Sequence, residues 1–190
     1  MAATATPYGM IPVKRVDGLP YAGALRKYVI ASGYNTNIFF GDVVALVAAG
    51  TVEKDTGTAT ATPIGIFMGT SYTDATQGFI NRQMWPANQV ASDALAFVCD
   101  DPTVLFKIQA NGSMVQGTVG ANFALVQNAG NTLNGNSANA LAAGAGATTA
   151  TLPLRMVDFW QGPESAVGDA FTDVLVKWNA GHQLGNTTGV

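Results

Sequence analysis

Gly41-Asp42-Val43-Val44-Ala45-Leu46-Val47 decides the fold of this chain, and Gly120-Ala121-Asn122-Phe123-Ala124-Leu125-Val126 echoes it. In both stretches a glycine precedes a run of apolar residues, which is typical of a strand that follows a turn. Two further landmarks recur in the same order. They are Thr60–Ile64 with Thr149–Leu154, and Trp85-Pro86-Ala87 with Trp178-Asn179-Ala180. The recurrence indicates two related β modules, although a sequence rich in alanine, threonine, valine and glycine also produces short matches by chance.

Other segments also have the pattern of strands. Val104-Leu105-Phe106-Lys107-Ile108-Gln109 alternates with a period of two, which places Val104, Phe106 and Ile108 on one face. Leu95–Cys99 and Val174–Trp178 are short apolar runs, and Asp100-Asp101-Pro102 is a turn signal. We therefore predict an all-β fold, a β-sandwich or barrel with little helix. Two segments leave room for helix, namely Ala22–Ile30 as a short helix and Ala138–Ala150 as one weak turn.

The N-terminal segment differs from the rest of the chain. Prolines and glycines alternate with apolar residues from Thr6 to Tyr28, which opposes regular structure and favours an extended arm. We expect an arm at residues 1–30, a β-rich body at 31–180 and a C-terminal tail at 181–190. Within the body, the echo predicts possible modules at 31–92 and 93–180.

Charge is scarce in this chain. Of its 190 residues only 11% are charged, against about 25% in typical globular domains. The net charge of −3 opposes nucleic acid as the main ligand. Ile108–Leu154 holds no charged residue, but amides, glycines and threonines interrupt it too often for a membrane span. Met1–Pro7 lacks the basic and apolar regions of a secretory signal. The composition fits a protein whose surface is largely polar but uncharged, or one whose surface is largely covered by partner proteins.

The reactive side chains do not form a catalytic or metal-binding pattern. His182 is the sole histidine and is expected to be a solvated residue of the tail, whereas Cys99 is expected in the core. Asp158, Glu164, Asp169 and Asp173 do not have the spacing of a calcium loop. We therefore predict no enzyme activity, no cofactor and no metal. The three tryptophans are expected as core or subunit-contact residues rather than as sugar platforms: Trp85, Trp160 and Trp178.

Three motifs of the chain carry a resemblance to a known family. Gly41-Asp42-Val43-Val44 leads through Gly50-Thr51-Val52 to Pro63-Ile64-Gly65-Ile66-Phe67-Met68-Gly69. This order resembles the β-rich head decoration (cement) proteins of tailed bacteriophages, and Pro7–Val13 looks like the arm-like start of phage structural proteins. The resemblance covers about a third of the chain. It implies a homotrimer on the exterior of a virion, made in the host cytoplasm and bound to a major capsid protein of the HK97 fold.

The expected partner contacts lie in the arm, because its apolar residues stand in a proline-rich segment. They are Tyr8, Met10, Ile11, Arg15, Leu19 and Tyr21. Such an arm would bridge adjacent capsomers and stabilise the shell, with avidity from many copies. Two alternatives stay open. The chain is another phage component, such as a tail, fibre or minor coat protein, or it is a carbohydrate-binding β-sandwich with Trp160 or Trp178 as a stacking platform.

Overall fold

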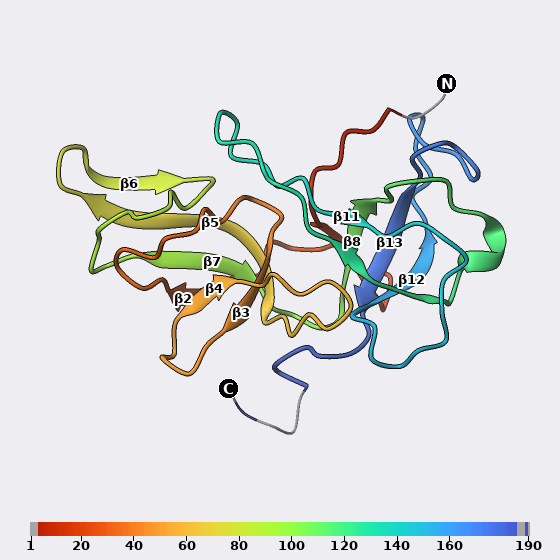
Figure 1. Cartoon of the computed structure of the whole chain (residues 1–190), viewed down its shortest axis with the longest axis horizontal. Coiled ribbons are helices and arrows are strands. Elements are labelled where there is room, and N and C mark those ends of the chain that lie inside the picture. The colour runs from red at the N-terminus through yellow and green to blue at the C-terminus, as the bar shows by residue number, and fades with distance from the viewer. Residues whose placement is uncertain (1–3, 186–188, 190) are drawn as a thin grey trace.

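The computed structural model describes residues 4–185 and 189, and antiparallel strands form nearly all of its regular structure (Figure 1). The N-terminal sheet has the order β2-β7-β5-β3-β4, with β6 paired to β5. The C-terminal sheet has the order β1-β8-β13-β12-β9, and β10 pairs with β11 in a small third sheet. The fold is all-β and of the β-sandwich class, as predicted. Within the described residues, the one helical element is the 3₁₀ turn η1, Gln116–Thr118.

The strands are short and evenly spread along the chain. Their bounds are β1 Ile11–Arg15, β2 Arg26–Val29, β3 Val43–Leu46, β4 Val52–Lys54, β5 Gly65–Asp74, β6 Gly78–Arg82, β7 Leu95–Cys99, β8 Val104–Gln109, β9 Asn122–Phe123, β10 Leu125–Val126, β11 Ala140–Leu141, β12 Leu154–Phe159 and β13 Asp173–Trp178. The chain changes sheet at the turn 100–103, so β7 belongs to the N-terminal sheet and β8 to the C-terminal sheet.

The two large sheets share one arrangement. The order β2-β7-β5-β3 in the first matches β8-β13-β12-β9 in the second. The irregularities match as well, because the β5–β7 ladder shifts register after Phe67 and the β12–β13 ladder shifts after Met156. In the strand pairs Val43 lies opposite Ile66, and Asn122 lies opposite Arg155. Each sheet is therefore built from the same four-stranded unit.

The first landmark of the sequence echo occupies equivalent places in these units. Gly41 N–H donates to Phe67 O at 2.8 Å, and Gly120 N–H donates to Met156 O at 2.9 Å. Both glycines have a φ of 88°, in the left-handed region that glycine adopts without strain. The tryptophan landmark has no such equivalence, because Trp85 lies outside the named strands whereas Trp178 ends β13.

Two apolar clusters form the core. One lies within the N-terminal sheet and its loops, with Trp85 and Tyr72 in edge-to-face contact at 5.3 Å between ring centroids. The other joins both sheets, because Val43 and Ile66 pack with Phe106 and other residues of the C-terminal sheet. Val104, Phe106 and Ile108 all lie in this second cluster, as their alternation predicts. The shared cluster makes the two sheets one packed body.

Neither of the two segments that left room for helix is helical. Arg26–Val29 of the segment 22–30 is strand β2, which pairs with β7, and the segment 138–150 contains β11 with no helical turn. All residues of β2 except Tyr28 are exposed, which suits the margin of a sheet. In segment 138–150, Ala140 and Leu141 pair with β10, so tertiary contacts override the helix propensity of alanine there.

The expectation that His182 is solvated is wrong. Its side chain is buried, and its ring lies 5.8 Å from that of Trp178. Gln183 anchors this part of the chain, because its side-chain amide exchanges two hydrogen bonds with the backbone of Leu46 at 2.7 and 2.9 Å. Its own N–H donates to Pro63 O at 2.8 Å. These bonds draw residues 181–185 onto the N-terminal sheet, which buries the imidazole.

Candidate partner-binding surface

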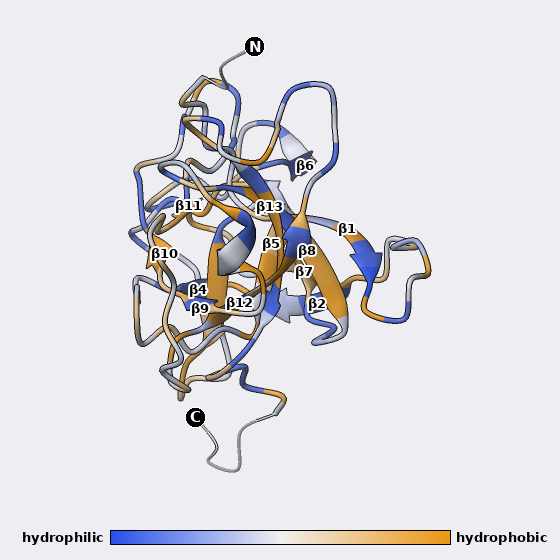
Figure 2. Ribbon diagram, turned by 90° about the vertical axis from the view of Figure 1, so that its right-hand side faces the viewer, coloured by the Kyte–Doolittle hydropathy of each residue, from blue (hydrophilic) through white to orange (hydrophobic). Residues whose placement is uncertain are grey.

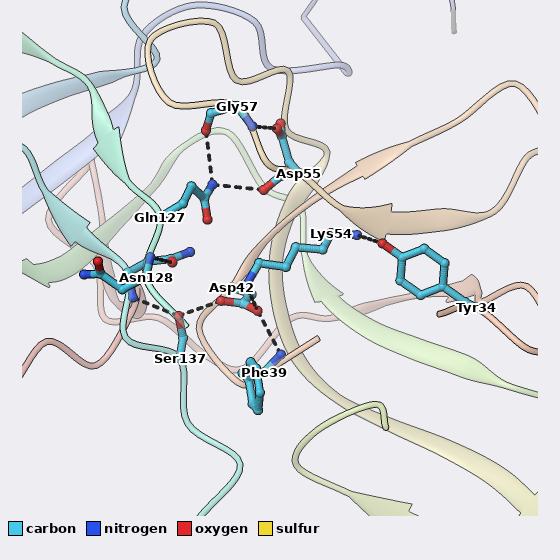
Figure 3. Close-up of polar contacts among 10 residues, drawn as sticks. Tyr34, Phe39, Asp42, Lys54, Asp55, Gly57, Gln127, Asn128 and Ser137 are labelled. Atoms are coloured by element: carbon cyan, nitrogen blue, oxygen red, sulfur yellow. Dashed lines mark hydrogen bonds and ion pairs between the residues drawn. The ribbon is translucent and has the colours of Figure 1, made fainter. Parts of the chain in front are cut away.

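A polar cluster joins the region around Asp42 and Asp55 to the segment 127–139 (Figure 3). Asp42 accepts hydrogen bonds from Phe39 N–H at 2.9 Å and from Ser137 Oγ at 2.6 Å, and it pairs with Lys54 Nζ at 2.9 Å. Gln127 extends the cluster, since its amide donates to Asp55 O at 2.9 Å and to Gly57 O at 3.1 Å. Side chains of the N-terminal sheet and of the segment 127–139 thus point at one another.

The arm crosses this cluster at Gly9. Gly9 N–H donates to Asn139 O at 3.1 Å, and Met10 N–H donates to Gly41 O at 3.0 Å. A Cβ on Gly9 would lie 2.6 Å from Gly41 O and 2.7 Å from the Cβ of Ser137. The backbone of Gly9 also has a φ of 79°. Only glycine fits this crossing without a shift of its neighbours.

Past the crossing, the arm becomes part of the C-terminal sheet. β1 pairs with β8, and the following chain returns along the other side of β1, where Arg15 N–H donates to Leu19 O at 2.8 Å. The first three expected contact residues lie against the body. Met10 is fully buried in the shared core, Ile11 is half-buried opposite Lys107, and Tyr8 is half-buried with its ring 5.2 Å from Lys107 Nζ. Burial and the carboxylates of Asp173 and Glu164 raise the pKa of Tyr8.

The remaining expected contact residues lie in or beside the turn that follows β1. Leu19 is 58% exposed at this turn, which projects from the body (Figure 2). Arg15 is half-buried and pairs with Asp17 at 3.6 Å. Tyr21 packs against the shared core and donates its hydroxyl to Ala24 O at 2.7 Å. Tyr8, Met10 and Ile11 thus hold the arm against the body. Arg15, Leu19 and Tyr21 lie in or beside the turn, where Leu19 is the exposed one.

Further exposed apolar residues lie in the same segment, and the sequence interpretation missed them. Val16, Leu25 and Val29 are 54%, 44% and 47% exposed. No period of two marks the last two, because Leu25-Arg26-Lys27-Tyr28-Val29 places two charged residues side by side and two apolar or aromatic residues after them. With Leu19 these residues form what we call the arm surface: Val16, Leu19, Leu25 and Val29.

β2 and β7 carry part of this surface on their outer side. Lys27 lies opposite Phe97 and Val29 lies opposite Leu95, and residues directly opposite in a ladder share a face. Ala96 and Val98, between them, point into the core of the N-terminal sheet. Lys27 Nζ lies 5.8 Å from the centroid of the Phe97 ring. The outer side thus combines exposed apolar area with a cation.

A second accessible feature is a groove beside Trp160. The groove has a volume of about 560 Å³ and is lined by Gln116, Asp158, Trp160, Gln161 and Val167, among others. Trp160 is half-buried, and Lys107 Nζ lies 5.1 Å from the centroid of its ring. Trp85 and Trp178 are buried, in agreement with their expected place in the core.

The reactive groups that the sequence singled out are dispersed. Cys99 is fully buried as expected, and burial raises the pKa of its thiol to about 11. Among the four acidic residues of the C-terminal region, Asp173 pairs with Lys107 at 2.9 Å and Asp169 accepts a hydrogen bond from Ala166 N–H. In residues 4–185 and 189, no three His, Cys, Asp or Glu side chains gather as metal ligands would. No helix in that same part of the chain is long and apolar enough to cross a membrane.

Comparison with known proteins gives no neighbour: no family model, no curated protein and no solved structure matches this chain.

Proposed function

We propose that this protein is a structural component of a virion, a decoration protein without catalytic activity that binds the outside of a phage head. The arm surface supports this role, because four of the eleven large apolar side chains exposed among the described residues lie within residues 16–29. Exposed apolar area that gathers in one region commonly marks a protein contact. The scarcity of charge fits the same role, since charged residues are depleted at the centres of interfaces.

The partner in this proposal is a major capsid protein of the HK97 fold, and the protein acts as a homotrimer that bridges adjacent capsomers. Rigid attachment of the arm suits a bridging element, because β1 is held by β8 and the polar cluster holds Gly9. A preorganised contact loses little conformational entropy when it binds. Many copies on one shell multiply the avidity of a modest contact.

The test is binding to empty HK97-fold shells, measured by co-sedimentation, together with the molar mass in solution from light scattering. We expect a trimeric mass and saturable binding. The double variant Val16→Ser/Leu19→Ser should weaken binding about tenfold or more, because fully burying a valine or leucine side chain contributes about 1.5 kcal/mol or more. Removal of the arm is not a clean test, since β1 and Met10 belong to the folded body.

The matched control is Leu133→Ser/Val167→Ser, which removes two exposed apolar side chains elsewhere on the chain. This control should bind shells like the unaltered protein. A monomer that does not sediment with shells, or equal loss in both double variants, would contradict the proposal.

The groove beside Trp160 favours one second candidate, a carbohydrate-binding module. A half-exposed indole next to a carboxylate and two amides is a combination that stacks on and hydrogen-bonds a sugar. Neutral hexaoses such as cellohexaose and maltohexaose should then protect tryptophan fluorescence from acrylamide, since Trp160 is the most exposed of the three tryptophans. Trp160→Phe should weaken this protection. Unchanged quenching at millimolar sugar would eliminate the candidate.

A further inference from the structure

The repeated four-stranded unit has one edge filled and the equivalent edge open. β8 is the outer strand of its unit and β1 pairs with it, whereas β2 is the equivalent outer strand and ends its sheet. The register makes the equivalence specific. Ile30 N–H donates to Ala94 O at 3.1 Å, as Ala110 N–H donates to Thr172 O at 2.9 Å. Lys27 of β2 therefore matches Lys107 of β8.

The backbone of β2 is available for pairing on its open side. In an antiparallel ladder alternate residues direct their N–H and C=O groups to opposite sides. Because Ile30 bonds toward β7, Arg26 and Tyr28 do so too, and Lys27 and Val29 direct their groups outward. Across the residues that the structure describes, none of these outward groups has a hydrogen-bond partner. On the matching side of β8, Lys107 is paired with Ile11 of β1.

The lysines of the two edges differ in their ion pairing, and this difference indicates which side chains an added strand would carry. Lys107 is neutralised by Asp173, with 2.9 Å between Nζ and Oδ2. The equivalent of Asp173 in the N-terminal sheet is Leu95, because Thr172 matches Ala94. Lys27 accordingly has no ion pair among the described residues and only contacts the Phe97 ring. The open edge thus lacks both a strand and a carboxylate.

We propose that the edge of β2 binds an extended, acidic segment of a partner protein as an added β-strand, with a carboxylate beside Lys27. Strand addition to an open edge is a general mode of peptide recognition, in which main-chain hydrogen bonds give affinity and alternate side chains give specificity. Apolar residues of the added strand alternate with its carboxylates and therefore lie on the other face, the face of Tyr28. The inference does not depend on whether that partner is a capsid protein.

Charge opposes a second copy of this chain as the occupant. β2 itself holds Arg26 and Lys27, and of these two residues only Arg26 has an ion pair among the described residues, with Asp100 at 3.1 Å. Two β2 edges in antiparallel contact would bring two such basic segments together, and like charges across a ladder are destabilising. An acidic strand from another protein would instead be attracted by the positive charge of this edge.

The probe is a labelled, end-blocked peptide, Thr-Val-Glu-Val-Glu-Val-Thr, titrated onto the full chain and followed by fluorescence anisotropy and amide hydrogen exchange. We expect saturable binding and slowed exchange at the amides of Lys27 and Val29. The same peptide with alternate amides N-methylated should not bind, because it cannot complete the ladder. A peptide with Lys in place of both Glu residues should bind more weakly.

Charge reversal at the edge gives the sharper comparison. Lys27→Glu should weaken the Glu peptide about tenfold and reverse the preference toward the Lys peptide, because a cross-strand attraction becomes a repulsion. Lys177→Glu is the matched control, since it makes the same change of net charge on β13 and should leave binding unchanged. Equal binding to both variants, no protection at β2, or protection at β6 instead would overturn the proposal. Protection of β2 that rises with protein concentration without peptide would identify a second copy and overturn it as well.

Discussion

At Gly9 one hydrogen atom in place of a side chain decides whether the arm can cross the body. Gly9→Ala combines a left-handed backbone with a Cβ placed 2.6 Å from Gly41 O and 2.7 Å from the Cβ of Ser137. We expect a loss of about 2–4 kcal/mol in the free energy of unfolding, from backbone strain and overpacking together. Chemical denaturation followed by tryptophan fluorescence measures it.

Gly18→Ala separates the two contributions to that loss. Gly18 has a φ of 87°, but a Cβ there would meet nothing within 4 Å. Strain alone should cost about 1 kcal/mol. Equal losses in the two variants would show that the contact at Gly9 is unimportant.

His182 connects pH to the attachment of the C-terminal segment. Burial lowers the pKa of its imidazole, against the opposing effect of the Asp100 and Asp101 carboxylates. The unfolded chain, with a histidine pKa of about 6.5, then binds the proton more readily than the folded chain. The stability that the buried neutral imidazole contributes is therefore fully present above about pH 6.5. It is lost as the pH falls from there toward the lower pKa of His182 in the folded protein.

Denaturation midpoints between about pH 7.5 and 5.5 test this, since most carboxyl groups titrate below that window. The unaltered protein should lose stability as pH falls, and His182→Phe should show a flatter profile. Phenylalanine keeps an aromatic ring beside Trp178 and removes the titrating nitrogens. Identical slopes in the two proteins would show that His182 is not the group responsible.

At the scale of elements, β1 is a structural strand of the body. Met10, just before it, is fully buried in the core that both sheets share. Met10→Ala should therefore reduce the free energy of unfolding by about 2–5 kcal/mol. Leu19→Ser, in the exposed turn that follows, should change it by less than about 0.5 kcal/mol. The opposite ranking in thermal melts would mean that the arm is detached in solution.

The sequence predicted strands best where burial imposes a period on side chains. β8 and β13 were recognisable because their apolar residues face a core on one side or both, and Cys99 was placed correctly for the same reason. β2 was ambiguous because its outer side chains are exposed and its neighbours include Gly23 and alanines. A strand at a sheet margin has a weak pattern of its own, and only its pairing with β7 shows what it is.

The candidate site in the arm stays a prediction, and the sequence did not separate its buried residues from its exposed ones. Apolar residues in a proline-rich segment drew attention to the arm, yet Met10 lies in the core and Val29 lies on the surface. Nothing local distinguishes the two, because each is an apolar residue followed by an isoleucine, Ile11 after Met10 and Ile30 after Val29. Their burial differs because the chain takes them to different places. Met10 donates its N–H to Gly41 O, whereas Val29 is the last residue of the outer strand β2. Such long-range contacts are invisible in a single sequence.

At the scale of the molecule, the two sheets should unfold together. Val43 and Ile66 of the N-terminal sheet share a core with Phe106 and Val176 of the C-terminal sheet. Residues 181–185 add a second connection through the amide of Gln183, which bonds to Leu46. A shared core couples the two units, so loss of either one exposes apolar surface of the other. We expect one calorimetric transition, with the calorimetric and van't Hoff enthalpies equal.

Gln183→Ala measures how much the second connection contributes to this coupling. Loss of its two hydrogen bonds should cost about 1–2 kcal/mol and lower the single transition by a few degrees without dividing it. Gln161→Ala is the control, because that exposed amide makes no hydrogen bond within the described residues. Two transitions in the unaltered protein would contradict the shared core. Two transitions in Gln183→Ala alone would mean that the C-terminal segment, and not the core, holds the sheets together.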